Sequence, residues 1–202
     1  SLDLPVHGQS RGAGCTTIAE YSRWLIRFMQ RLELSGPVLA GHSMGGAVVL
    51  EVAIEYPEEI DGLILIGSGA RLRVSSEILQ GIEADFETTA EQLVQRCYGP
   101  GTSEKVVKWG LEQLLAEQPR VILDDFKACN EFDKLGKIGG IRHPALVICG
   151  SDDNMTPPKY SQYLADNLRR ATLRVIDGAG HMVMVENAFK TNAAILKFLA
   201  TL

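Results

Sequence analysis

Short apolar runs alternate with longer segments of helical period along most of the chain. Four runs rich in Leu, Ile or Val predict β-strands at residues 38–40, 63–66, 145–149 and 173–176. Three of them are expected to be buried on both faces. Helical patterns predict helices at residues 16–34, 45–55, 158–168 and 186–199. This alternation is typical of βαβ units, so we expect an α/β fold with a mostly parallel sheet flanked by helices.

Between the second and third runs, from about residue 71 to 140, the strand pattern disappears. Helical stretches are predicted there at residues 76–97, 103–117 and 119–130, separated by turn glycines. We interpret this block as a helical cap inserted between two strands. The expected organisation is therefore a core of residues 1–70 and 141–202 and a cap of residues 71–140.

Composition and charge narrow the classes of function. The 202 residues carry 20 Lys and Arg against 25 Asp and Glu, and 46% of them are hydrophobic, which indicates one globular domain. No run of Lys and Arg is present, which argues against nucleic acids and anionic membranes as partners. No apolar run reaches the ~20 residues of a membrane span. The four cysteines lack CxxC spacing and are predicted to be free thiols.

The clearest chemical motif is the segment GHSMGG at residues 41–46, between a predicted strand and a predicted helix. This is the context of a G-x-S-x-G nucleophile elbow, in which Ser43 adopts a strained, exposed conformation and positions 41 and 45 must lack side chains. The amide of Met44 at the helix start is expected to form half of an oxyanion hole. The alternative is a glycine-rich turn with an incidental serine.

A serine nucleophile needs a base, and the chain has four histidines. His181 follows the last predicted strand at its carboxyl end, the edge of an α/β sheet where catalytic groups gather and where Ser43 also lies. His42 is inside the elbow, His143 precedes a strand, and His7 lies in a loop before the first helix. His181 is therefore the predicted base, although a surface or capping histidine is the alternative.

The base needs an orienting carboxylate. Asp152 and Asp153 follow the third predicted strand, also at its carboxyl end, and one of them is expected to hold His181. The chain order serine, aspartate, histidine is the order of α/β-hydrolases. No H-x-x-x-H, C-x-x-C or P-loop pattern is present, so we expect neither a metal nor an organic cofactor.

The chain resembles the α/β-hydrolase family in four motifs that occur in the same order. They are D-L-P-x-H-G-x-S from Asp3, the elbow, the loop at residues 150–157 and G-H-M at residues 180–182. Similarity to the family's G-x-x-D-x-x-x-P loop assigns the acid to Asp153 and makes Asp152 a neighbouring turn residue. Val6 stands where the family usually has Gly, so that turn is expected to be built differently. The resemblance implies a serine esterase or lipase-like enzyme that works through an acyl-enzyme.

Family members carry several strands before these motifs, including a loop that supplies a second oxyanion-hole amide, and this chain has none of them. We therefore expect the N-terminal part of the sheet to be missing, with residues 38–40 at an exposed edge. One explanation is that the sequence is the remainder of a longer protein. The other is that a second chain, such as the partner in a homodimer, covers the edge.

The cap sets substrate choice in this family, and here it is apolar and mixed. Its large apolar residues are expected mainly to form the cap's own core: Leu72, Ile78, Leu79, Phe86, Leu93, Trp109, Leu114, Leu115 and Phe126. The substrate-pocket candidates are His42, Met182 and Arg71. For Arg71 and Arg73 the favoured interpretation is exposure to solvent, and the alternative is that they bind a substrate carboxylate.

The first choice of function is hydrolysis of a small-molecule carboxylic ester. A carbon–carbon bond hydrolase or an enol-lactonase of the same fold is an alternative that would suit a carboxylate-binding arginine. A ligand receptor or a non-catalytic remnant on a hydrolase scaffold is a further alternative, since fold alone does not decide function.

Overall fold

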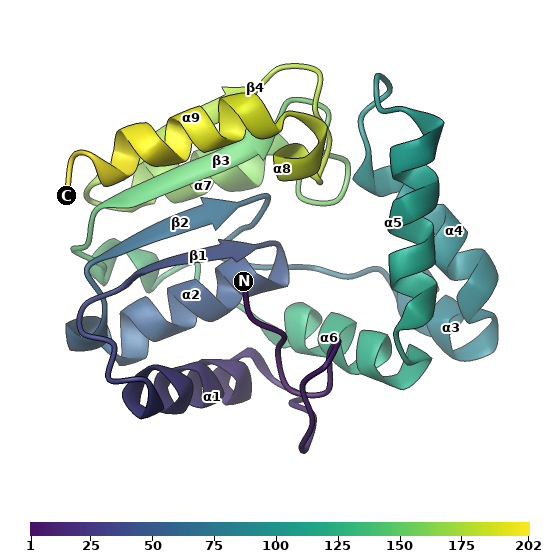
Figure 1. Ribbon diagram of the computed structural model, residues 1–202, viewed down its shortest axis with the longest axis horizontal. Helices are drawn as coiled ribbons and strands as arrows, with labels where there is room; N and C mark the ends of the chain where they lie inside the picture. Colours follow the sequence, from purple (N-terminus) through teal and green to yellow (C-terminus); the bar gives the residue numbers. More distant parts are fainter.

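The computed structural model describes residues 1–202, and its centre is a sheet of four parallel strands (Figure 1). The strands are β1 (Val38–His42), β2 (Gly62–Ile66), β3 (Ala145–Gly150) and β4 (Ala171–Ile176), and they pair in this order. All four therefore end at the same edge of the sheet. The α/β fold with a parallel sheet flanked by helices, expected from the sequence, is confirmed.

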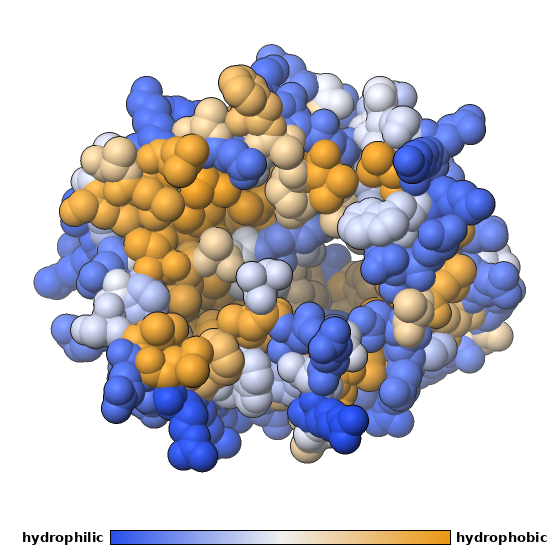
Figure 2. Space-filling model, in the orientation of Figure 1, coloured by the Kyte–Doolittle hydropathy of each residue, from blue (hydrophilic) through white to orange (hydrophobic).

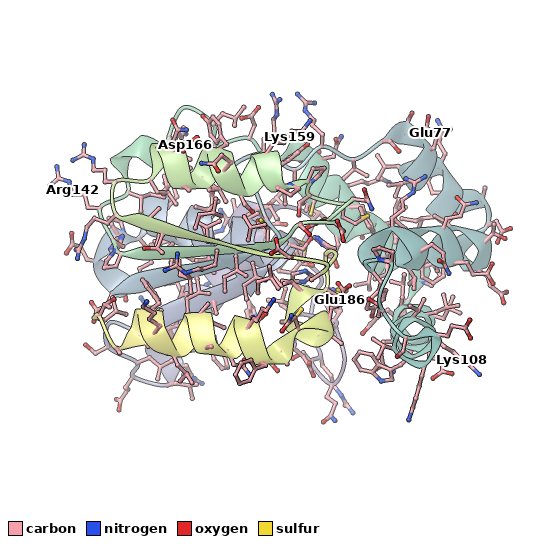
Figure 3. The ribbon with its side chains drawn as sticks, turned by 90° about the horizontal axis from the view of Figure 1, so that it is seen from above. Glu77, Lys108, Arg142, Lys159, Asp166 and Glu186 are labelled. Atoms are coloured by element: carbon pink, nitrogen blue, oxygen red, sulfur yellow. The ribbon has the colours of Figure 1, made fainter.

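Helices cover both faces of the sheet. One face carries α1 (Ile18–Arg31), α2 (Met44–Glu55) and α7 (Pro158–Asn167), and the other carries α8 (Val183–Glu186) and α9 (Ala188–Leu199). Figure 3 shows α7 and α9 on opposite sides of the strands. Two 3₁₀ turns, η1 (Pro57–Glu59) and η2 (Ile138–Gly140), complete the core. None of the helices is long and apolar enough to cross a lipid bilayer.

The alternation of side chains along β2 divides the buried apolar residues into two clusters. Leu63 and Leu65 join a cluster of 25 buried residues beneath α1, α2 and α7. Ile64 and Ile66 join a cluster of 8 buried residues beneath α8 and α9. Only β2 and β3 are buried along their whole length, so the expectation of three doubly buried strands was wrong. The reason is that β1 and β4 are the edges of the sheet.

Four helices lie between β2 and β3 in the sequence and beyond the carboxyl ends of the strands in space (Figure 1). They are α3 (Ser76–Ala84), α4 (Phe86–Cys97), α5 (Glu104–Ala116) and α6 (Pro119–Glu131). The sequence predicted α3 and α4 as one helix, which was wrong. Asp85 ends α3 in an extended conformation, and its Oδ1 accepts a hydrogen bond from Thr88 N at 3.2 Å, which caps α4.

Local capping explains where two other helices start. Thr17 and Glu20 form a capping box at the start of α1, with Glu20 N 3.2 Å from Thr17 Oγ1. The helix predicted from residue 186 begins instead at Ala188. Asn187 caps it by accepting a hydrogen bond from Lys190 N at 3.2 Å, which separates α9 from the short α8.

Candidate active site

Ser43 lies between β1 and α2 in the strained conformation that the elbow motif predicts. Its φ of 51° falls in the left-handed region that non-glycine residues rarely adopt. Two contacts with the β2 side hold the turn: Ser43 N donates to Ile66 O at 2.9 Å, and Ser68 Oγ donates to Ser43 O at 2.8 Å. Ser43 is half-buried rather than exposed, at the carboxyl edge of the sheet.

The glycines of the elbow differ in what they make room for. A Cβ at Gly41 would collide with the carbonyl of Gly45, so this position must lack a side chain, as predicted. A Cβ at Gly45 would meet nothing within 4 Å, so the sequence-based requirement there was wrong. The second tight contact involves Gly46 instead, whose added Cβ would lie 2.5 Å from Ser68 Oγ.

Met44 supplies the first amide of α2 and has no residue four positions earlier within the helix to accept from it. The N-terminal end of a helix also carries partial positive charge. Both facts make the Met44 N–H, one residue after Ser43, suited to hold a negatively charged oxygen.

Asp153 and His181, which follow β3 and β4, are brought together beneath the surface. His181 Nδ1 lies 2.9 Å from Asp153 Oδ2, and the side chains are 5% and 0% exposed. Asp152 is directed elsewhere, with its Oδ1 3.4 Å from Ser151 Oγ. Of the two candidate acids, the structure therefore pairs Asp153 with His181.

Asp153 is held as a carboxylate by the donors around it. Burial raises its pKa, but the hydrogen bond from His181 and those from Thr156 prevail, and the pKa lies below its ordinary value. Its Oδ1 accepts from the amides of Met155 and Thr156, both at 2.8 Å, and its Oδ2 accepts from Thr156 Oγ1 at 2.9 Å. Sequence reasoning missed Thr156, although a threonine three residues after an aspartate is a recognisable loop pattern.

An ionised Asp153 determines the state of His181. A carboxylate only accepts hydrogen bonds, so His181 Nδ1 carries the proton that it donates to Asp153. In the neutral imidazole the other nitrogen, Nε2, then has a free lone pair, and it has no hydrogen-bond partner in the structure. This is the tautomer that a general base needs.

His42 packs against His181 rather than lining a pocket. The two ring centroids are 4.5 Å apart, and His42 Nε2 donates to the backbone carbonyl of His181 at 3.0 Å. Burial and the neighbouring His181 lower the pKa of His42 to about 3, so its ring stays neutral. Because His42 precedes Ser43 directly, this contact also places the His181 ring beside the elbow, a role that the sequence did not reveal.

A cavity of about 190 Å³ opens at Ser43 between the core and the cap. It is lined by Ser43, Leu72, Arg73, Val74, Ser75, Ile78, Arg96, Phe126, Cys129, Asn154, Met155, Thr156 and Tyr160. None of the three predicted pocket residues is among them. Arg71 instead lies 3.6 Å from Asp133 and lines a separate cavity beside α7, while Arg73 and the unpredicted Arg96 face the cavity at Ser43.

A larger cleft of about 1360 Å³ lies beside the loop that carries Asp153. It runs between α4, α5 and residues 151–158 and includes Asp153 in its lining. Figure 2 shows the molecule hollowed between the core and the cap helices. Ser43 is not part of this lining, and Asn154 is the residue that lines both spaces.

The remaining reactive side chains do not form a second site. All four cysteines are free thiols, as predicted, and burial raises the pKa of Cys97 and of Cys129 to about 12. No group of three or more His, Cys, Asp or Glu side chains is arranged to hold a metal ion.

Comparison with known proteins places this geometry in context. Residues 1–194 match the model of the "Alpha/beta hydrolase family". The chain is 31% identical over 217 residues to an (E)-2-((N-methylformamido)methylene)succinate hydrolase of Acinetobacter baylyi. The match includes 100% of this chain and 80% of that protein. It is also 32% identical over 212 residues to the dihydrolipoyllysine-residue acetyltransferase component of an acetoin cleaving system of Pseudomonas putida. That match includes 98% of this chain but only 55% of the relative.

Among solved structures, a thermophilic esterase superimposes with a TM-score of 0.89 at 32% sequence identity. The match covers 98% of this chain and 79% of that one. The agreement extends over both the sheet and the cap helices, since so little of the chain is left out.

Proposed function

The chain belongs to the alpha/beta hydrolase family, and from the geometry of its site we propose that it is a serine hydrolase that cleaves carboxylic esters. Ser43 is the nucleophile, His181 the general base and Asp153 the group that orients and stabilises the imidazolium. The observation that carries the proposal is the 2.9 Å hydrogen bond between His181 Nδ1 and the buried Asp153 carboxylate, beside the strained elbow serine.

In the first step, His181 Nε2 takes the proton of Ser43 Oγ as that oxygen attacks the ester carbonyl. The carbonyl oxygen becomes an oxyanion, which the Met44 N–H stabilises at the start of α2. The protonated His181 remains hydrogen-bonded to Asp153 and gives its proton to the leaving alcohol. The acyl group stays on Ser43 as an ester.

In the second step, His181 takes a proton from a water molecule, which attacks the acyl-enzyme. The acid leaves, and the proton returns through His181 to Ser43 Oγ. Thr156 supports both steps because its hydroxyl and amide keep Asp153 ionised and in place. His42 supports them from the other side by holding the His181 backbone.

Turnover of 4-nitrophenyl esters of increasing acyl length tests the proposal. We expect measurable kcat with the wild-type chain and a loss of at least about 10⁴-fold in Ser43→Ala. Cavity volume favours short acyl groups, because the space at Ser43 is about 190 Å³. Turnover that is unchanged by Ser43→Ala would refute the assignment, and binding of esters without turnover would favour a ligand receptor.

A second candidate function is favoured by the two arginines at the cavity: hydrolysis of a substrate that carries a carboxylate. Neither Arg73 nor Arg96 has a carboxylate within ion-pair distance, whereas Arg71 is paired with Asp133. Two unpaired guanidinium groups beside one small cavity attract an anionic group. The Acinetobacter relative is named for a succinate, which carries carboxylates. Such a substrate could be an ester, an enol-lactone or a compound cleaved at a carbon–carbon bond.

Paired substrates separate the two candidates. We propose comparing 4-nitrophenyl butyrate with the 4-nitrophenyl monoester of succinic acid in wild type, Arg96→Gln and Arg73→Gln. If the arginines select a carboxylate, each variant lowers kcat/KM for the charged ester about 10-fold or more while butyrate hydrolysis changes little. Arg71→Gln is the matched control, because Arg71 lines a different cavity. Equal effects on both esters would remove the second candidate.

A further inference from the structure

One backbone segment of the core, which carries the candidate base His181, is in direct contact with one backbone segment of the cap. We call residues 97–102, between α4 and α5, the cap turn, and residues 178–182, between β4 and α8, the histidine loop. The amides of His181 and Met182 both donate to Cys97 O, at 2.8 and 3.1 Å. A Cβ added at Gly180 would lie 2.5 Å from Gly99 N, so the backbones of the two segments touch with no side chain between them.

Glu186, the last residue of α8, joins these two segments a second time. Its Oε2 accepts from Gly99 N and from Thr102 Oγ1, both at 2.7 Å, and its Oε1 accepts from Gly180 N at 2.9 Å. Figure 3 shows Glu186 at the junction of α8 with the cap helices. No cation pairs with this carboxylate, so three neutral donors satisfy it. Hydrogen bonds to an ionised acceptor are stronger than neutral ones.

The position of these bonds bears on the chemistry because Gly180 directly precedes His181. Glu186 makes no hydrogen bond to Ser43, Asp153 or the imidazole, so it takes no part in proton transfer itself. It fixes the backbone on which the imidazole is carried. Asp153 and His42 hold His181 from the core, while Cys97 O accepts from its amide on the cap side.

We propose that Glu186 is a positioning residue that clamps the cap turn to the histidine loop and thereby fixes His181 for the reaction. The proposal rests on the proposed role of His181 as the base. It means that the placement of the cap and the placement of the base are set together, by the Glu186 carboxylate in addition to the Cys97 carbonyl.

The chemistry requires a carboxylate at this position. In Glu186→Gln one oxygen is replaced by an NH₂ group, which is a donor, while the three groups that surround it all donate. At least one donor must then face another donor, and the clamp opens on one side. Thr102 contributes a single bond, so Thr102→Val weakens the clamp and Thr102→Ser retains it.

The rate constant with which a fluorophosphonate labels Ser43 tests the proposal, because it can be measured for the reactive chains alone. Intact mass gives the fraction of chains that can be labelled, and the time course gives the rate constant for those chains. A purely structural role lowers the fraction and leaves the rate constant unchanged. Asp177→Asn is the matched control, because it also removes a negative charge close to His181 in sequence, but from an exposed side chain with no hydrogen bond.

We expect Glu186→Gln to lower the rate constant about 10-fold, since small displacements of a catalytic group have effects of this size or larger. Thr102→Val should lower it about 3-fold, Thr102→Ser should restore it, and Asp177→Asn should match wild type. An unchanged rate constant per labelled site in Glu186→Gln would overturn the proposal. So would an equal loss in Asp177→Asn, because the charge alone would then explain the effect.

Amide hydrogen exchange separates failure of this proposal from failure of the proposed function. If wild type is not labelled at Ser43, the proposed function fails, and exchange decides the clamp by itself. We expect amides of both the cap turn and the histidine loop to exchange about 10-fold faster in Glu186→Gln than in Asp177→Asn. Equal exchange in the two variants, or faster exchange in one segment only, would overturn the clamp.

Discussion

The core and the cap are stabilised in different ways. The core buries clusters of 25 and 8 apolar residues on the two faces of its sheet, whereas the cap's own cluster contains only Ile82, Ile122 and Leu123 as buried members. Helix α5 has no buried residue at all. Apolar burial therefore fixes the core, while the cap depends on a thin cluster and on its contacts with the core.

Those contacts are both apolar and polar. Ala128, Cys129 and Phe132 of the cap belong to the larger core cluster. His7 Nε2, in the loop before α1, lies 2.7 Å from Asp125 Oδ2 on α6, and Glu186 holds the turn between α4 and α5. The same division applies to the candidate site. Ser43, Asp153 and His181 all come from the core, and the cap contributes to the lining of the cavity. We therefore attribute the chemistry to the core and substrate selection to the cap.

The largest expected effect is on the chemistry of the core. Asp153→Asn should lower kcat about 10⁴-fold for neutral and charged esters alike, because the amide favours the wrong tautomer of His181. Steady-state kinetics with both 4-nitrophenyl esters checks this, with circular dichroism as a control for folding. A loss confined to one ester would contradict the division between chemistry and selection.

Truncation of buried side chains compares the stability of the two regions. Leu65→Ala, in β2, should lower the free energy of unfolding by about 3 kcal/mol, because it leaves a cavity in the larger core cluster. Ile82→Ala, in the cap, should cost about 2 kcal/mol or less, since the thin cluster can relax around it. Urea unfolding followed by fluorescence measures both. A larger loss in Ile82→Ala would mean that the cap is as tightly fixed as the core.

The ion pair between His7 and Asp125 makes the attachment of the cap dependent on pH. The hydrogen bond to Asp125 and its negative charge raise the pKa of His7 to about 9 from its ordinary 6.5, although burial opposes the shift. Because the folded state holds the proton more tightly, its contribution is complete below about pH 6.5 and disappears as the pH rises to about 9.

Allowing for the partial exposure of both side chains, this contribution should be about 2 kcal/mol. The difference in unfolding free energy between wild type and His7→Gln should therefore be largest near about pH 6 and close to zero above about pH 9.5. Urea unfolding over this range measures it. A difference that stays constant with pH would show that His7 contributes by packing alone.

The smallest effect concerns Val6, next to His7. Val6, which stands where the family usually has Gly, has a left-handed conformation with φ of 63°. A β-branched residue is strained there, so Val6→Gly should raise the free energy of unfolding by about 1 kcal/mol. Thermal unfolding checks the sign, and a lower melting temperature would mean that the packing of Val6 outweighs the strain.

The sequence was sufficient where the signal is local or repeated along an element. The short apolar runs predicted all four strands. It was insufficient where a single polar residue divides a continuous helical pattern, as Asp85 and Asn187 do. The resemblance placed residues 38–40 at an edge, as the structure does, but hydrophobicity could not show that β4 is the other edge, because it does not record the order of strands in a sheet.

In the candidate site, too, residues with a local sequence signal were predicted, and residues placed by long-range contacts were not. Ser43, Asp153 and His181 were found because each follows a strand in a recognisable loop. Arg96 was missed because its place at the cavity depends on how the cap helix α4 sits over the core. His42 was assigned to the pocket because the sequence does not show that its ring lies against His181.

The most direct test of the account is the site of covalent modification by a fluorophosphonate. Wild type and Ser43→Ala are treated with the reagent, and intact mass and peptide mapping locate any adduct. We predict one adduct per chain on Ser43 and none in Ser43→Ala. An adduct on another residue that persists in Ser43→Ala, or no adduct on the wild-type chain, would contradict the claim that Ser43, His181 and Asp153 form a working nucleophilic site.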